Sequence, residues 1–349
     1  MVKRNYGIEL LRLVLMFMVC LLHTVGQGGI LHYSIKGSIN YNIFWLIEIF
    51  SYCAVDSFAI ISGYTAKDKP QKYDKIVNMW FQVIFYSFIL TLLLTLIGIN
   101  KNFEITDIIK NLLPITFKKF WYMTAYFILF FSMPILNKFL FNIDKKTAQK
   151  CFLIIFILFS IFGTLGDPFV TQNGYSPIWL IILYCLGALA NKIELFKNKK
   201  NITLIGLWFV SIISTWLIYI FLDVDIFIKY ISPTILLNAI IMVILFSRMN
   251  LKGTIISKLS SLTLGIYLFQ LSPVIWNNII KDAFIFVTTK NIFTGILLVF
   301  AIASIIFISG LIIEFIRSKL SNLLKIPLLS KKIVSLIDKL LDIITITLK

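Results

Sequence analysis

The sequence predicts an all-α protein, a polytopic membrane bundle of about ten transmembrane helices with cytoplasmic N- and C-termini. Three observations favour this class. Of the 349 residues, 59% are hydrophobic and only 14% are charged, and the mean hydropathy is +0.92. Apolar windows of about 20 residues, long enough to cross the hydrocarbon core of a bilayer, recur along the chain. Lysine and arginine are unevenly distributed between the loops, which orients the bundle.

The apolar windows define a transmembrane domain over residues 1–316 and an amphipathic cytoplasmic tail over residues 317–349, which is expected to rest on the inner leaflet. The first window holds Arg12 and lacks a small-residue cleavage site, so we expect it to be retained rather than removed as a secretory signal. The expected spans are 7–26, 43–66, 76–99, 120–141, 151–166, 175–191, 202–222, 231–247, 259–280 and 292–316.

The charged residues follow the positive-inside rule. With the N-terminus in the cytoplasm, inner segments carry 24 lysines and arginines and outer loops carry 8, and Arg12 completes the total of 33. The net charge of +17 is therefore explained by topology, with anionic membrane lipids as its counter-charge. No basic domain stands apart from the spans, so no nucleic-acid partner is expected. The predicted location is the cell membrane, with multiple passes.

The cysteines do not indicate a metal site. Cys20, Cys53, Cys151 and Cys185 all fall within or beside apolar spans, without a CxxC motif or a cluster of metal-ligand spacing. We interpret them as small apolar side chains and expect no metal.

Arg12 and His23 are the strongest functional signal in the first span, because ionisable side chains are costly in a bilayer. Eleven residues are almost three helical turns, so both side chains are expected on one helix face, separated by roughly 16 Å along the axis. A structural alternative exists for Arg12, because Glu9 precedes it by three residues and could form an ion pair with it.

Glu48 is expected at the depth of His23, because consecutive spans run in opposite directions. A carboxylate there could fix the tautomer of the imidazole and raise its basicity. The alternative is that Glu48 extends to the outer headgroups while His23 bonds to a backbone carbonyl. On the inner side, Lys72 and Lys75 belong to a loop with four lysines that could bind a phosphate-bearing ligand, although the positive-inside rule also places lysines there.

The first two spans resemble the acyltransferase 3 family of integral-membrane enzymes that acylate exported sugars. Residues 4–12, Arg-Asn-Tyr-Gly-Ile-Glu-Leu-Leu-Arg, are followed after ten residues by His23, which is similar to the opening of that family. Residues 58–64, Phe-Ala-Ile-Ile-Ser-Gly-Tyr, resemble its Phe-x-x-Ser-Gly-aromatic stretch.

Later segments extend the resemblance over about residues 4–316. Two later features add to the resemblance. One is a middle span that begins with tryptophan and an aromatic residue and ends with proline, and the other is a later span that contains glycine. They are found at Trp121, Tyr122, Tyr126 and Pro134 and at residues 184–187.

Two positions depart from the family pattern. Where the family carries Arg-x-x-Arg after the second span, this chain has Lys72-Tyr-Asp-Lys75, which keeps the charge but loses the bidentate fork. Gln270 stands where a Tyr-Leu-x-His pattern would place histidine. Glutamine can form hydrogen bonds but cannot move a proton, which puts acid-base chemistry at that position in doubt. His32, the other histidine, is expected in a solvated outer loop.

The resemblance implies O-acetylation or a similar acyl transfer, from cytosolic acetyl-CoA or another acyl-CoA to a hydroxyl of a lipid-linked or polymeric glycan of the cell envelope. Arg12, Lys72 and Lys75 would bind the phosphates of the donor, and Tyr64 would line its passage. His23 would act as the base or would carry the acyl group briefly, with Glu48 as its partner.

Two other functions remain open from the residues. A multi-spanning transporter or flippase for a polysaccharide precursor or a small solute would use the intramembrane charges to bind solute or relay protons. A polysaccharide polymerase or ligase would be expected to place cations and carboxylates in a large outer loop. The longest outer loop, residues 100–119, instead carries an amphipathic stripe of isoleucines and leucines.

Overall fold

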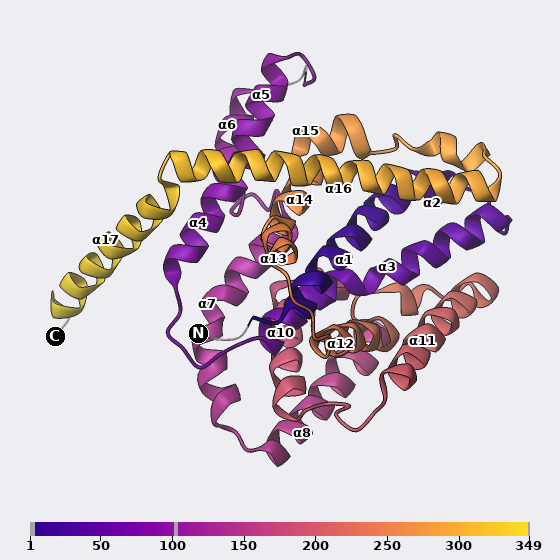
Figure 1. Cartoon of the computed structure of the whole chain (residues 1–349), viewed down its shortest axis with the longest axis horizontal. Helices are drawn as coiled ribbons and strands as arrows, with labels where there is room; N and C mark the ends of the chain where they lie inside the picture. The colour runs from indigo at the N-terminus through magenta and orange to yellow at the C-terminus, as the bar shows by residue number, and fades with distance from the viewer. Residues whose placement is uncertain (1–3, 101–103, 348–349) are drawn as a thin grey trace.

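The computed structural model describes residues 4–100 and 104–347, and their regular structure is entirely helical (Figure 1). Short π-helical or 3-10 segments connect or extend many of the α-helices. The α-helices are α1 (Tyr6–Leu22), α2 (Ile30–Tyr33), α3 (Ile39–Tyr64), α4 (Tyr73–Ile84), α5 (Leu90–Leu96), α6 (Ile105–Leu112), α7 (Trp121–Asn142), α8 (Lys145–Ile155), α9 (Gly163–Gly166), α10 (Pro177–Lys192), α11 (Asn201–Leu222), α12 (Pro233–Ser247), α13 (Thr254–Ser260), α14 (Thr263–Gln270), α15 (Pro273–Ile275), α16 (Ile292–Leu323) and α17 (Ile326–Thr347).

Eight helical stretches within the described residues are long and apolar enough to cross a membrane. The all-α, polytopic class predicted from composition is therefore confirmed, and each stretch corresponds to one of the ten expected spans. They are Tyr6–Tyr33, Ile39–Tyr64, Tyr73–Leu96, Trp121–Asn142, Lys145–Gly166, Asn201–Leu222, Asp225–Ser247 and Ile292–Leu323.

The other two expected spans differ in form. The segment expected at 175–191 is the shorter helix α10, which begins at an N-cap serine, Ser176, followed by proline at the first helical position. The segment expected at 259–280 is a bent pair, Thr254–Gln270 and Pro273–Thr289, with 55° between its halves. Proline lacks the N–H that a continuous helix needs and disfavours helical geometry in the residue before it, so the break falls at Ser272.

Helix α3 is central to the packing and contacts α1, α10, α11 and α12 (Figure 1). Its closest approach is to α10, where Gly63 faces the backbone carbonyl of Tyr184 and Gly187 faces that of Ile60. A β-carbon at either glycine would overlap those carbonyls. The two glycines therefore allow the backbones to meet, as small residues do at helix contacts in membranes.

A buried carboxylate of α16, Glu314, links this helix to α4 and its π-helical extension. Glu314 accepts two hydrogen bonds from Arg317, each of 2.8 Å. It also accepts from the amide of Gln82 at 3.1 Å and from the hydroxyl of Tyr86 at 2.8 Å. Four bonds satisfy a carboxylate that would otherwise be costly to bury. Gly265 of α14 packs directly against Glu314, so the network also fixes the position of α14.

Candidate active site

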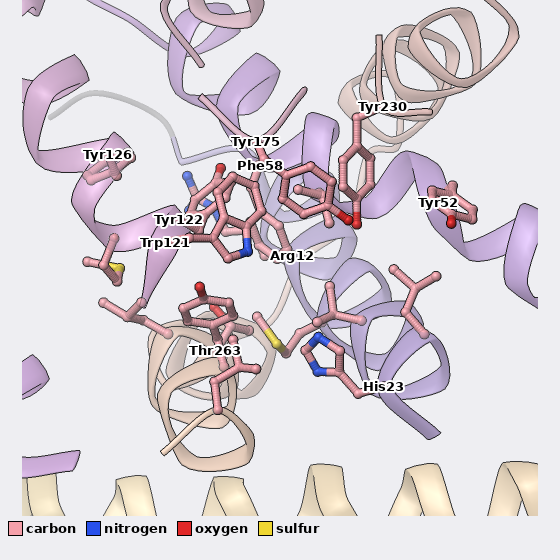
Figure 2. Close-up of a pocket in the computed structure, with 18 of the residues that line it drawn as sticks. Arg12, His23, Tyr52, Phe58, Trp121, Tyr122, Tyr126, Tyr175, Tyr230 and Thr263 are labelled. Atoms are coloured by element: carbon pink, nitrogen blue, oxygen red, sulfur yellow. The ribbon is translucent and has the colours of Figure 1, made fainter. Parts of the chain in front are cut away.

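A cavity of about 490 Å³ lies inside the bundle, bordered by α1, α3, α7 and α14 (Figure 2). Its volume falls in the range of small-molecule sites, roughly 300–1,000 Å³. Aromatic side chains and methionines form much of its wall, while Arg12, His23 and Glu48 supply its charged or ionisable groups. The cavity thus contains the two residues of the first span that the sequence singled out.

One face of each of the first two spans lines the cavity. The lining residues recur every three or four positions, as expected for one side of a helix. They are Arg12, Met16, Val19, Leu22, His23 and Gln27 in the first span and Glu48, Tyr52, Val55, Phe58 and Ser62 in α3.

His23 begins a π-helical turn, His23–Gln27, at the end of α1. Such turns insert an extra residue into a helix and occur frequently at functional sites. Backbone bonds fix this turn to the second half of the broken helix pair, because Gln27 accepts from the N–H of Asp282 at 3.0 Å and Gly28 accepts from that of Phe284 at 2.9 Å. The position of His23 therefore depends on the broken helix pair.

The two halves of the broken helix pair each place one side chain against His23. Gln270, the last residue of α14, has its amide oxygen 3.0 Å from Nδ1 of His23. Trp276, beyond the break, meets the imidazole edge to face, with ring centroids 5.5 Å apart. The bend at Ser272 is what allows both side chains to reach the same ring.

The contact with Gln270 favours one tautomer of His23. An amide oxygen can only accept a hydrogen bond, so this contact is a hydrogen bond in the tautomer whose Nδ1 carries the proton. The lone pair then lies on Nε2, which makes no hydrogen bond to any described residue. A neutral imidazole held in this way presents a free basic nitrogen.

The hydrogen bond expected between Glu48 and His23 is not present among the described residues. Gln270 occupies Nδ1 instead, because α14 reaches the imidazole at that position. Glu48 lines the same cavity, is only 7% exposed and lies against Gly26. Oε2 of Glu48 has no hydrogen-bond partner in residues 4–100 and 104–347. A buried carboxylate oxygen that borders a cavity without a partner is suited to accept a hydrogen bond from a ligand.

Arg12 takes part in both interactions considered for it. Its Nη1 donates to Oε1 of Glu9 at 3.3 Å, so the structural ion pair is present. Glu9 also lies 3.4 Å from the guanidinium of Arg4 and accepts from Ser260 at 2.6 Å. Arg12 nevertheless lines the cavity. One carboxylate thus faces two guanidinium groups, which leaves positive charge at this end of the cavity.

The remaining expected donor-binding residues lie outside the cavity wall. The hydroxyl of Tyr64 lies 3.1 Å from that of Ser247, which links α3 to α12. Lys72 and Lys75 are exposed at the start of α4. Met79, one turn after Lys75 on the same helix face, does line the cavity.

Sequence reasoning did not assign the aromatic wall to the site, although Trp121, Tyr122 and Tyr126 were among the residues that carry the family resemblance. Trp121, Tyr175 and Tyr230 form a continuous series, with ring centroids 4.8 Å apart in the first pair and 5.0 Å in the second. Tyr122 and Tyr267 also line the cavity, and their buried hydroxyls have no hydrogen-bond partner within the part of the chain that the structure describes. Aromatic residues are common throughout this chain, so composition gave no signal for Tyr175, Tyr230 and Tyr267.

No group of three or more His, Cys, Asp and Glu side chains suited to a metal ion occurs within residues 4–100 and 104–347. The four cysteines are free thiols, buried or half-buried. The groups available for chemistry in this cavity are therefore an imidazole, a carboxylate, a guanidinium and several phenols.

These features define a multi-pass membrane protein with an internal ligand-sized cavity, in which an oriented imidazole and a guanidinium lie along one helix face. A family model described as an acyltransferase domain matches residues 5–316, nearly the whole chain. The chain belongs to the acyltransferase 3 family and is a membrane acyltransferase, as the resemblance of its motifs predicted. Searches of curated proteins and of solved structures gave no match.

Proposed function

We propose that the protein transfers a short acyl group, in the first instance acetyl, from cytosolic acyl-CoA to a hydroxyl of an extracytoplasmic or lipid-linked glycan. The observation that carries this proposal is the placement of Arg12 and His23 on one wall of a single cavity, with Nε2 of His23 left free. The family match favours this activity over transport or flipping of a solute. The cell membrane is the proposed location.

His23 acts as the general base in the proposed reaction. Nε2 takes the proton of the acceptor hydroxyl as the hydroxyl oxygen attacks the thioester carbonyl carbon. The tetrahedral adduct then collapses, the carbon–sulfur bond breaks, and the imidazolium returns the proton to the leaving sulfur. The products are an ester and CoA thiol, and the histidine is regenerated. Gln270 is a positioning residue, because it holds Nδ1–H throughout the cycle.

The donor is proposed to enter from the side on which Arg12 lies. Arg12 would contact its phosphates with the donors not used by Glu9, since guanidinium groups bind phosphate through several N–H groups. Lys75 and Lys72 precede Met79 on α4 and would hold the nucleotide end outside the cavity, with Tyr64 beside the entrance. A raised KM for acetyl-CoA in a Lys72→Gln, Lys75→Gln variant, without a change in kcat, tests this part.

The acceptor is proposed to occupy the region around Glu48. Its free Oε2 would accept a hydrogen bond from an acceptor hydroxyl, and the unpartnered hydroxyls of Tyr122 and Tyr267 would supply further bonds. The faces of Tyr175 and Tyr230 offer apolar surfaces for the acceptor ring.

The decisive experiment follows label from radioactive acetyl-CoA to envelope glycans extracted from the source cells, with the purified protein in liposomes. His23→Ala is expected to lower kcat by about 10²–10⁴-fold, the usual range for loss of a general base. His32→Ala is the matched control, because His32 is exposed outside the cavity and should leave kcat unchanged.

Labelling by His23→Ala at the rate of the wild type would disprove the catalytic role of this residue. Stable label on the wild-type protein itself, in the absence of acceptor and lost in His23→Ala, would replace general-base catalysis with an acyl-histidine intermediate.

A further inference from the structure

A second cavity, of about 560 Å³, lies where the start of α8 meets the segment after α10. It is called the basic groove here and is lined by Lys145, Gln149, Phe152, Leu153 and residues 193–199. The lysine distribution along the chain assigns both helix ends to the cytoplasmic side. No residue of the groove lines the candidate active site. The groove is therefore a separate site.

The rim of the basic groove carries excess positive charge. Three lysines and one glutamate line it, which gives a formal charge of +2. The carboxylate of Glu194 accepts hydrogen bonds from Lys145 at 2.8 Å and from Lys197 at 2.7 Å, so it fixes both ammonium groups at the rim. These bonds and charges lower the pKa of Glu194 to about 2. Lys199, the third lysine, forms no ion pair with any described residue.

The lysines at the rim keep donors for a ligand. Each ammonium group has three N–H donors, and those of Lys145 and Lys197 have only Glu194 as an acidic partner among the described residues. The neighbouring Asp144 does not compete, because its carboxylate accepts from the backbone N–H groups of Lys146 and Thr147.

Much of the remaining lining of the groove is apolar. Phe152 is buried, Phe196 is half-buried, and Leu153 is 58% exposed beside them. Lysines and apolar side chains in one groove match an amphiphile with an anionic head, whereas a free nucleotide or inorganic phosphate would leave the apolar wall uncovered.

The groove is preformed by a constrained backbone. Glu194 and Phe196 have φ values of 53° and 60°, in the left-handed region that residues other than glycine rarely adopt. Arg248 holds this segment by donating hydrogen bonds to the backbone carbonyls of Phe196 and Lys199. Backbone strain of this kind persists only where surrounding contacts enforce it, and it clusters at ligand-binding segments.

We propose that the basic groove binds the phosphate headgroup of an anionic phospholipid from the cytoplasmic leaflet, with one acyl chain lying along Phe152 and Leu153. The lysine ammonium groups contact the phosphate, and the apolar wall covers the first part of the chain. Basic pockets between transmembrane helices on the cytoplasmic side bind lipid headgroups by the same chemistry. This site is independent of the acyl-transfer reaction.

The test measures lipid binding by the full-length protein in neutral detergent, with native mass spectrometry during titration of phosphatidylglycerol or phosphatidylcholine. Wild type is expected to retain phosphatidylglycerol preferentially. Replacing Lys145, Lys197 and Lys199 together with glutamine should weaken that binding by at least about tenfold, since each lysine near anionic lipid contributes measurably to the attraction.

The matched control removes the same charge elsewhere on the cytoplasmic side, by replacing Lys252, Lys258 and Lys319, which are all exposed, with glutamine. This control should bind phosphatidylglycerol like the wild type. Equal weakening in the two triple variants, equal retention of phosphatidylcholine by the wild type, or displacement of the lipid by equimolar inorganic phosphate would each overturn the proposal. If the groove variant does not fold, Lys199→Gln alone carries the test, because its ammonium forms no ion pair in the described structure.

Discussion

Replacement of Gln270 by leucine tests whether the hydrogen bond to Nδ1 of His23 sets the activity of the imidazole. Leucine provides a side chain of similar size at the end of α14 but has neither the amide oxygen that contacts Nδ1 nor the amide N–H group that faces the sulfur of Met16. The imidazole then loses the contact that places its proton on Nδ1 and its lone pair on Nε2. Both the orientation and the tautomer of His23 become less well defined.

The magnitude follows from the change in charge during the reaction. In the ground state the bond joins two neutral groups, but in the transition state Nε2 gains a proton and the bond becomes charge-assisted and stronger. A hydrogen bond to a charged group contributes about 1.5–3 kcal/mol, and about 1.4 kcal/mol corresponds to a factor of ten in rate, so kcat should fall roughly 10- to 100-fold. KM for acetyl-CoA should not change, because an interaction that strengthens only in the transition state affects kcat.

The assay measures kcat and KM in liposomes with acetyl-CoA and the envelope glycan extract, and a monodisperse elution profile confirms that each variant is folded. Gln270→Glu is the matched variant, because its carboxylate oxygen can accept the same hydrogen bond, and it should retain much more activity than Gln270→Leu. The reasoning is refuted if Gln270→Leu has the kcat of the wild type, if its defect lies only in KM, or if the glutamate variant is equally impaired.

Three further outcomes are expected. Gly63→Ala should lower the melting temperature, because overpacking a tight contact costs about 1–3 kcal/mol. Gly206→Ala is the control and should not lower it, because a β-carbon there meets open space. Equal melting temperatures of the two variants would contradict the close contact between α3 and α10. Glu48→Gln should raise KM for the glycan more than KM for acetyl-CoA, and unchanged kinetics would remove Glu48 from the site. Because the pKa of Glu194 is lowered to about 2, its stabilising ion pairs are fully present above pH of about 4.5 and are lost only as the pH falls through about 2. Infrared difference spectra against Glu194→Gln should therefore show an ionised carboxylate at about pH 4. A protonated carboxyl group at that pH would disprove the ion pairs of Glu194 with Lys145 and Lys197.

The parts of the fold that could be predicted from the sequence are those that depend on a short stretch of chain. The length and apolarity of each segment are contained in about 20 consecutive residues, so eight of the ten expected spans correspond to helices that are long and apolar enough to cross a membrane. The same patterns could not show that the segment at 259–280 bends by 55°, although Pro273 marked the place. They also could not show that α16 continues to Leu323, because a helix can extend beyond the hydrocarbon core.

Some residues of the candidate site could also be recognised from the sequence, whereas the contacts between them could not. Arg12 and His23 were recognised because charge and imidazole are costly in an apolar span, and helical periodicity placed them on one face. The contact between His23 and Gln270 joins residues 247 positions apart. No periodicity spans that distance, so Glu48 was the nearest candidate partner that the sequence could offer.

By itself, therefore, the sequence determined that this protein crosses a membrane many times and carries an ionisable pair in its first span, because hydrophobicity and helical spacing act over short stretches of chain. Only the tertiary structure decided which nitrogen of His23 is free, which carboxylate oxygen lacks a partner and where the lysines surround a groove. Those features arise where distant helices pack, and the packing depends on the shapes and contacts of all the helices together.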